Sequence, residues 1–210
     1  MIELNNELSE KIREIKLYYS KKINDRIVDF MNVGKSDNRS LFIELSFCIL
    51  TANTSAEMGI KTQKYIMDGF IEYDRDKLRD ELKKIKYRFY NKRTDYIVNA
   101  RFVMNDLKEL LSGNDKNYAR EYLVNNIKGI GYKEASHFLR NTGIFNFAIL
   151  DKHIMGILMD YNYIDSVKLN SKKDYLETEE IFNRIAKSYK LKPGIFDLYL
   201  WKIATNKILK

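Results

Sequence analysis

The segment Ile127-Lys128-Gly129-Ile130-Gly131-Tyr132-Lys133-Glu134-Ala135 is the part of the chain that says most about its architecture. Gly129 and Gly131 stand one residue apart, which permits a tight hairpin whose backbone can approach a ligand closely. The apolar residues on both sides have helical spacing, so the hairpin joins two helices, and the amides that begin the second helix can hold a phosphate. A plain connection with glycine caps would use the same residues, so spacing alone leaves both interpretations open.

Helical periodicity extends outward from this hairpin in both directions. Apolar residues three or four positions apart predict a long helix over residues 8–30, a polar break at 34–40, and a clear helix over 96–111. The stretch 147–150 is apolar but too short and isolated to build a sheet. The other predicted helices begin at Leu41, at Thr54 or Ser55, at Asp74, after Gly131, at Asp151, before Ile181 and at Pro193. The pattern therefore predicts an all-α protein.

Length and composition exclude several classes of protein. The chain has 210 residues, about one and a half times a domain of about 150, which indicates one compact unit or two small domains. A content of 45% hydrophobic and 31% charged residues with one proline favours a packed core over disorder. No apolar run approaches the roughly 20 residues that cross a bilayer, and the first residues lack the apolar block of a signal peptide, so we expect a cytoplasmic protein without membrane contact.

Charge and cysteine content bear on the partners of the chain. Lys and Arg outnumber Asp and Glu by 37 to 29, which gives a formal net charge of +8. A basic surface favours polyanions, and the 13% aromatic content supplies rings that can stack on bases, although charge alone favours nucleic acid only slightly. The single cysteine, Cys48, excludes an internal disulfide and any site built from four cysteines, such as an iron–sulfur cluster.

The hairpin also carries a resemblance. The pattern apolar-x-Gly-apolar-Gly-x-Lys-x-Ala between two helices resembles the helix-hairpin-helix motif of the DNA glycosylase superfamily, whose hairpin grips DNA phosphates through main-chain amides. That superfamily places a nucleophilic lysine two residues after the second glycine, where this sequence has Lys133. It places an essential aspartate further on, after a short apolar segment and at the start of a helix, which matches Asp151. The two matches together are more specific than either alone.

A narrower resemblance covers nearly the whole chain. The segments 133–141, 87–90, 50–53 and 197–210 are similar to those of the archaeal-type, type 2 8-oxoguanine DNA glycosylases. The family implies two small helical subdomains with the active site in the cleft between them. Residues 35–148 would form the subdomain with the helix-hairpin-helix, and residues 1–34 with 149–210 the other. It also implies an enzyme that removes 8-oxoguanine from double-stranded DNA and cleaves the strand at the abasic site by β-elimination. Because the sequence lacks a cysteine quartet, it differs from the iron–sulfur branch of the superfamily.

The resemblance implies a role for each of several residues. Lys133 would attack C1′ of the damaged nucleotide through an uncharged amine, and Asp151 would stabilise positive charge on the sugar. Because a base inside a duplex is out of reach, the nucleotide must be flipped out and the gap filled. The implied DNA-contacting residues are Lys128, Gly129, Ile130 and Gly131 in the hairpin, Asn53 in the gap, Arg88 and Phe89 at the opposite base, and Asp197, Trp201 and Lys210 at the damaged base.

Each of these residues also has a purely structural interpretation. Lys133 could be a solvated lysine, Asp151 a helix cap and Trp201 a core residue. His137 and His153 lack the spacing of a metal site, and we expect no metal and no cofactor, although the hairpin carbonyls could bind a monovalent cation. We expect a monomer. A binding module without chemistry and a glycosylase for another lesion are the alternative functions, and the pairing of Lys133 with Asp151 favours an enzyme over a binding module.

Overall fold

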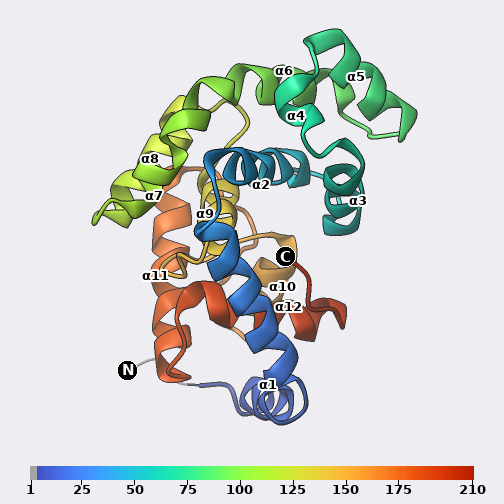
Figure 1. Ribbon diagram of the computed structural model, residues 1–210. Helices are drawn as coiled ribbons and strands as arrows, with labels where there is room; N and C mark the ends of the chain where they lie inside the picture. The colour runs from blue at the N-terminus through green and yellow to red at the C-terminus, as the bar shows by residue number, and fades with distance from the viewer. Residues whose placement is uncertain (1–3) are drawn as a thin grey trace.

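The computed structural model describes residues 4–210, and the fold is helical along this part of the chain, without strands (Figure 1). This confirms the predicted all-α class. The elements are α1 (Asn6–Gly34), α2 (Asn38–Thr51), α3 (Ala56–Ile66), α4 (Gly69–Glu72), α5 (Arg75–Lys84), α6 (Tyr90–Ala100), the 3-10 helix η1 (Arg101–Asp106), α7 (Leu107–Ser112), α8 (Lys116–Asn126), α9 (Tyr132–Asn141), α10 (Lys152–Asp160), α11 (Lys172–Ser188) and α12 (Pro193–Thr205).

Side-chain caps explain where most of the helices begin. A short polar side chain accepts a hydrogen bond from a backbone N–H of the first turn, which satisfies a donor that has no partner inside the helix. Each such cap stabilises its helix by about 1 kcal/mol. The capping residues of α1, α2, α3, α5, α8, α10 and α11 are Asn5, Asp37, Ser55, Asp74, Asp115, Asp151 and Ser171.

The helices enclose two hydrophobic cores. The first core surrounds α2 and is completed by α3 to α9, which form the upper part of Figure 1. The second core lies between α1, α10, α11 and α12 in the lower part of the same view. Helix α9 packs against α2 and α8 on one side and against α1 and α12 on the other, so the helix that follows the hairpin joins the two halves.

The chain crosses between the cores in the segment 145–150. Phe147 packs in the first core, whereas Phe145, Ala148 and Leu150 pack in the second. The predicted division of the chain at residue 148 therefore differs slightly from the packing, since Phe145 and Ala148 already belong to the second core. Across residues 4–210, no helix combines the length and the apolar character that crossing a membrane requires.

The single helix predicted over 96–111 is wrong, because three elements occupy this range: the end of α6, η1 and α7. Ile97 and Ala100 of α6 and Val103 of η1 are all buried, and in η1 the tighter winding of three residues per turn keeps this spacing directed toward the core. Arg101 holds the break by donating from Nε to the carbonyl oxygen of Phe70 and from Nη2 to that of Tyr73.

Candidate active site

The hairpin connects α8 to α9 and is anchored by its two isoleucines. Ile127 and Ile130 are 3% and 5% exposed and belong to the first core. Between them, Gly129 has φ 92°, a conformation that residues with a Cβ rarely adopt. A Cβ at this position would lie 2.3 Å from Cδ2 of Tyr96, so the close approach of the hairpin to α6 also requires glycine.

Lys133 lies in the first turn of α9, directly after the hairpin. Its Nζ is 2.8 Å from Oε1 of Glu134, and its side chain is only 25% exposed. The other carboxylate oxygen of Glu134 accepts a hydrogen bond of 3.2 Å from the N–H of Gly131. Lys133 is therefore a partly enclosed lysine that is paired with a neighbour bonded to the hairpin. Sequence reasoning overlooked Glu134, although a glutamate three residues after the residue that caps a helix is a known capping signal.

Asp151 begins α10 at the other side of the site. Its Oδ1 accepts hydrogen bonds of 2.8 and 2.9 Å from the N–H groups of His153 and Ile154. These bonds hold the carboxylate at the positive end of the helix, where a negative charge is favoured. The capping interpretation of Asp151 is thus correct, and it is compatible with a catalytic role because the same residue lines the cleft described next.

A cleft of about 1250 Å³ brings the predicted site residues together. Lys133 and Asp151 both line it, and so do Asn53, Asp197, Trp201 and Lys210. Arg88, Phe89 and the four hairpin residues 128–131 lie outside its lining. The structure therefore places both catalytic candidates and most of the base-contacting candidates on one concavity, with the hairpin and the α5–α6 turn beyond it.

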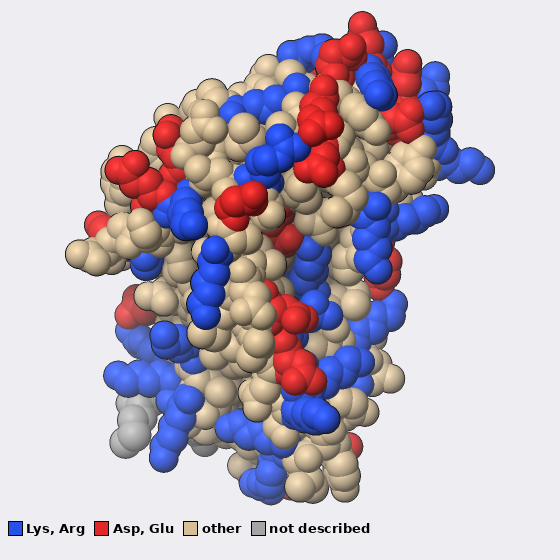
Figure 2. All heavy atoms as spheres, viewed as in Figure 1, with Lys and Arg blue, Asp and Glu red and all other residues tan. Residues whose placement is uncertain are grey.

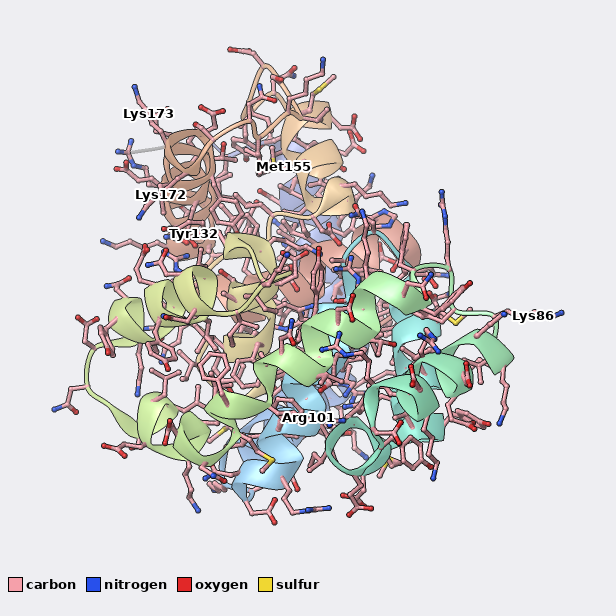
Figure 3. The ribbon with its side chains drawn as sticks, turned by 90° about the horizontal axis from the view of Figure 1, so that it is seen from above. Lys86, Arg101, Tyr132, Met155, Lys172 and Lys173 are labelled. Carbon is pink, nitrogen blue, oxygen red and sulfur yellow. The ribbon has the colours of Figure 1, made fainter. Side chains whose placement is uncertain are left out.

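Four helices begin at the wall of this cleft. The first residues of α3, α9, α10 and α11 all line it: Ala56, Tyr132, Lys152 and Lys172. Each helix N-terminus carries partial positive charge and unpaired N–H groups, which favour anions such as phosphates. Lys172 of α11 lies over the ring of Tyr132, with Nζ 5.3 Å from the ring centroid, as Figure 3 shows from above. On the face shown in Figure 2, Lys and Arg are spread widely while Asp and Glu gather mainly toward the top.

Two predicted base-contacting residues of α12 have different surroundings. Trp201 is partly exposed and has its ring 5.2 Å from that of His153, which leaves part of the indole in the cleft. Asp197 is fully buried and its Oδ2 accepts a hydrogen bond of 2.5 Å from Arg140. Burial raises the pKa of Asp197 to about 7, although the neighbouring Arg140 opposes the rise. Asp197 thus lines the cleft from a buried position in which Arg140 holds its carboxylate, and a direct contact with a base stays a prediction.

Lys210 is held against the first core by its side-chain contacts. Its Nζ donates to Oε2 of Glu44 at 2.6 Å and to Oε1 of Gln63 at 2.5 Å, and it lies 4.2 Å from the ring centroid of Phe47. The remaining carboxylate oxygen of Glu44 accepts a hydrogen bond of 2.6 Å from Asn141. Sequence reasoning missed Glu44, although a glutamate inside the apolar run 41–50 is a signal of a buried charge that needs a partner.

The histidines have no metal partners. His137 is buried one helical turn after Lys133 on α9 and meets the ring of Phe47 edge-on, with the ring centroids 5.6 Å apart. Burial, together with the positive charges of Arg140 and Lys133, holds the pKa of His137 well below its usual range, so this histidine is neutral. Within residues 4–210, no group of three or more His, Cys, Asp or Glu residues has the arrangement of a metal site.

The segments expected to meet the opposite strand lie at the edge of the first core. Asn53 is exposed and has φ 61°, a left-handed conformation that asparagine tolerates well. Arg88 is exposed and lies over the partly buried ring of Phe89, 4.9 Å from its centroid. Tyr87 and Arg93, on either side of this pair, are buried, with 1% and 7% exposed.

Comparisons with known proteins agree with this geometry. The chain matches the family model described as 8-oxoguanine DNA glycosylase over residues 23–191. It is 53% identical over 203 residues to the 8-oxoguanine DNA glycosylase/AP lyase of Picrophilus torridus, and the match covers 97% of each chain.

Two solved structures are similar in fold as well as in sequence. The crystal structure of the 8-oxoguanine DNA glycosylase of Thermotoga maritima has a TM-score of 0.93 at 42% identity and covers 97% of this chain and 99% of that one. The Methanocaldococcus jannaschii 8-oxoguanine glycosylase/lyase, in complex with a 15mer DNA containing 8-oxoguanine, has a TM-score of 0.92 at 46% identity and covers 96% of this chain and 98% of that one.

Proposed function

The chain belongs to the 8-oxoguanine DNA glycosylase family, and on that basis we propose that Lys133 is the nucleophile with which it removes 8-oxoguanine from double-stranded DNA. The family assignment agrees with the resemblance found in the sequence. Like the relatives named as glycosylase/AP lyases, the protein then cleaves the strand at the abasic site. The observation that carries the proposal is that Lys133 and Asp151, from different helices, line the same cleft.

The chemistry follows from the residues at this cleft. The uncharged amine of Lys133 attacks C1′ of the everted nucleotide, and the bond from C1′ to the base breaks with its electron pair passing to the base. Opening of the sugar ring leaves a Schiff base between Lys133 and C1′. Loss of a proton from C2′ then breaks the bond between C3′ and its oxygen, which is β-elimination, and water releases the lysine from the sugar. Asp151 stabilises positive charge on the sugar and assists the proton transfers.

Glu134 contacts the amine that carries out the first step, the attack on C1′. Its Oε1 lies 2.8 Å from Nζ of Lys133 and so positions the amine, which attacks C1′ through its lone pair. Asp151 lines the same cleft from the start of α10.

Recognition of the damaged base falls to α12 and the C-terminal residue. The exposed part of Trp201 supplies a face on which the base stacks. Lys210, whose ammonium is held by Glu44 and Gln63, lines the same cleft and contributes to the pocket for 8-oxoguanine. Asn53 fills the gap, Arg88 and Phe89 meet the opposite base, and hairpin residues 128–131 hold a phosphate through backbone amides. A monovalent cation at the hairpin, a monomeric state and a cytoplasmic location stay predictions.

Borohydride trapping tests the nucleophile. Duplex oligonucleotides carrying 8-oxoguanine, an oxidised pyrimidine or undamaged guanine are incubated with the protein and borohydride, which reduces a Schiff base to a stable covalent complex. We expect a complex with the 8-oxoguanine duplex, its loss in Lys133→Gln, and its retention in Lys173→Gln, which removes the same charge at a side chain that is 81% exposed. Trapping that persists in Lys133→Gln would reject the proposed nucleophile, and trapping only with the pyrimidine lesion would reject the substrate.

A further inference from the structure

Three segments expected to contact DNA meet at one helix, α6. They are the turn 52–54 that follows α2, the turn 85–89 between α5 and α6, and the hairpin 127–131. We propose that Arg93 and Tyr96, about one turn apart on α6, are positioning residues that hold these three segments in the arrangement needed to bind and open a duplex. The inference rests on the proposed function, because it concerns how the same site engages its DNA.

Arg93 fixes the turn that presents Asn53. Its guanidinium is 7% exposed, and Nη2 donates to the carbonyl oxygen of Ala52 at 2.7 Å. Ala52 follows the last turn of α2, where carbonyl oxygens have no partner inside the helix, so this charged donor replaces water. The oxygen of Ala52 and the nitrogen of Asn53 belong to one planar peptide group. By holding that oxygen, Arg93 fixes the orientation of this peptide group and therefore the direction in which Asn53 projects from the protein surface.

A hydrogen bond also attaches the turn between α5 and α6 to the C-terminal end of α2. Tyr87 is 1% exposed, and its hydroxyl donates to the carbonyl oxygen of Leu50 in the last turn of α2. Thr54 donates to the same oxygen at 2.6 Å from the other end of the turn. The Arg93 guanidinium also lies over Phe89, 5.9 Å from its ring centroid. The segments assigned to the gap and to the opposite base therefore share one set of buried hydrogen bonds and cannot shift independently.

Tyr96 connects this unit to the hairpin. The Arg93 guanidinium lies 5.5 Å from the ring centroid of Tyr96. The Tyr96 ring also contacts Gly129 of the hairpin. A Cβ at Gly129 would lie 2.3 Å from this ring, so the ring lies directly against the hairpin backbone. Lys128 extends over the same ring, with Nζ 5.9 Å from its centroid. The distance between the hairpin and the other two segments is thus set by an aromatic ring in contact with glycine.

This arrangement matters because the three segments act on one rigid substrate. The hairpin holds the backbone while the two turns enter the stack, so a displacement of either turn moves Asn53 away from the vacated space. A displacement of about 1 Å far from the reacting atoms can reduce a rate about 100-fold. An abasic nucleotide has no base to unstack, so its cleavage depends less on the two turns than excision of a paired base does.

Arg93→Met tests the first part of the proposal, with Arg101→Met as a matched control. Arg101, labelled in Figure 3, also caps carbonyl oxygens of the first core, at Phe70 and Tyr73, but it touches none of the three segments. We expect Arg93→Met to lower single-turnover excision of 8-oxoguanine from a duplex about 100-fold and cleavage of a preformed abasic duplex less than about tenfold. Arg101→Met should lose a similar amount of thermal stability with excision within about threefold of the wild type.

Arg93→Lys keeps the test decisive if the methionine variant does not fold, because lysine retains one donor for the Ala52 oxygen. We expect it to recover at least about tenfold of the lost excision rate. Arg93 variants that lose excision and abasic cleavage equally, or that behave like Arg101→Met, would overturn the proposal. Those outcomes would reject only the role of Arg93, because the wild-type protein would still form the borohydride-trapped complex with 8-oxoguanine DNA. If the wild-type protein formed no such complex, the proposed function itself would be rejected.

Tyr96→Leu tests the contact with the hairpin, and Tyr118→Leu on the exposed face of α8 is its control, since Tyr118 is 60% exposed. We expect Tyr96→Leu to weaken binding of undamaged duplex about tenfold, because the hairpin grips the backbone whether or not a lesion is present. Tyr118→Leu should bind within about twofold of the wild type. Equal binding by the two variants would contradict the role of Tyr96.

Discussion

Glu44→Gln is the substitution that most directly tests how the C-terminal residue is held. The carboxylate of Glu44 is 5% exposed and receives Lys210 and Gln63 on one oxygen and Asn141 on the other. Glutamine has nearly the same shape but replaces one accepting oxygen with an NH2 group, which would face one of these donors. The substitution therefore removes the charge and leaves an opposed pair of donors in a buried place.

The structure sets the size of the effect. Breaking a fully buried ion pair costs about 3–5 kcal/mol, and because Lys210 is 18% exposed and glutamine retains one acceptor, we expect about 2–3 kcal/mol. For a chain of this length that loss lowers the melting temperature by about 4–12 °C. On the proposed role of Lys210, its release also removes one charge-assisted hydrogen bond to the base, which corresponds to an excision rate about ten- to 100-fold lower.

Thermal unfolding and two activity assays check this prediction, with Glu57→Gln as the control. Glu57 pairs with Lys207 on the same C-terminal segment, but these side chains are 49% and 53% exposed, and such a pair contributes about 0–1 kcal/mol. We expect Glu44→Gln to lose excision of 8-oxoguanine while cleavage of a preformed abasic site stays within about threefold. If the two variants have equal melting temperatures, or if excision and cleavage fall together, the argument that Glu44 acts through Lys210 is refuted.

Three further predictions follow from other parts of the structure. Gly129→Ala should cost about 2–5 kcal/mol of folding free energy, from the left-handed conformation and the contact with Tyr96, whereas Gly156→Ala, where nothing lies within 4 Å, should be neutral or stabilising in a denaturant titration. Asp197 has a pKa of about 7 in the folded protein, whereas its ordinary value is 3.8, so between these pH values the folded state binds a proton that the unfolded state does not. The free energy of unfolding therefore falls as the pH rises through this range. Urea titrations at several pH values should show a smaller fall in Asp197→Asn than in the wild type. The net charge of +8 predicts that duplex affinity decreases steeply with salt, and a flat response in a fluorescence anisotropy titration would show that the basic residues do not meet the DNA.

Local features of the sequence were sufficient for the helices and the hairpin. A capping side chain, a buried residue every three or four positions and a glycine at a left-handed turn act through neighbours a few residues away, so their effects are readable along the chain. The prediction of one helix over 96–111 was wrong because a spacing of three residues is compatible with both an α-helix and a 3-10 helix. Local sequence does not distinguish the two, and the packing of this segment on the core does. Likewise, the resemblance could propose Lys133 and Asp151 because each has a fixed position relative to a hairpin or a helix start.

The partners of the buried charged residues could be identified only from the tertiary structure. Arg140 with Asp197, Glu44 with Lys210, and Arg93 with the carbonyl oxygen of Ala52 join positions that are 57, 166 and 41 residues apart. Periodicity marks a residue as facing inward but does not state which distant group it meets. A buried charge is stable only with a partner, and only the packing of the two cores around α9 brings those partners together. The sequence by itself therefore determined most of the helices and the side chains proposed to react, and the tertiary structure decided which charges support them, because burial and pairing arise only when distant segments are in contact.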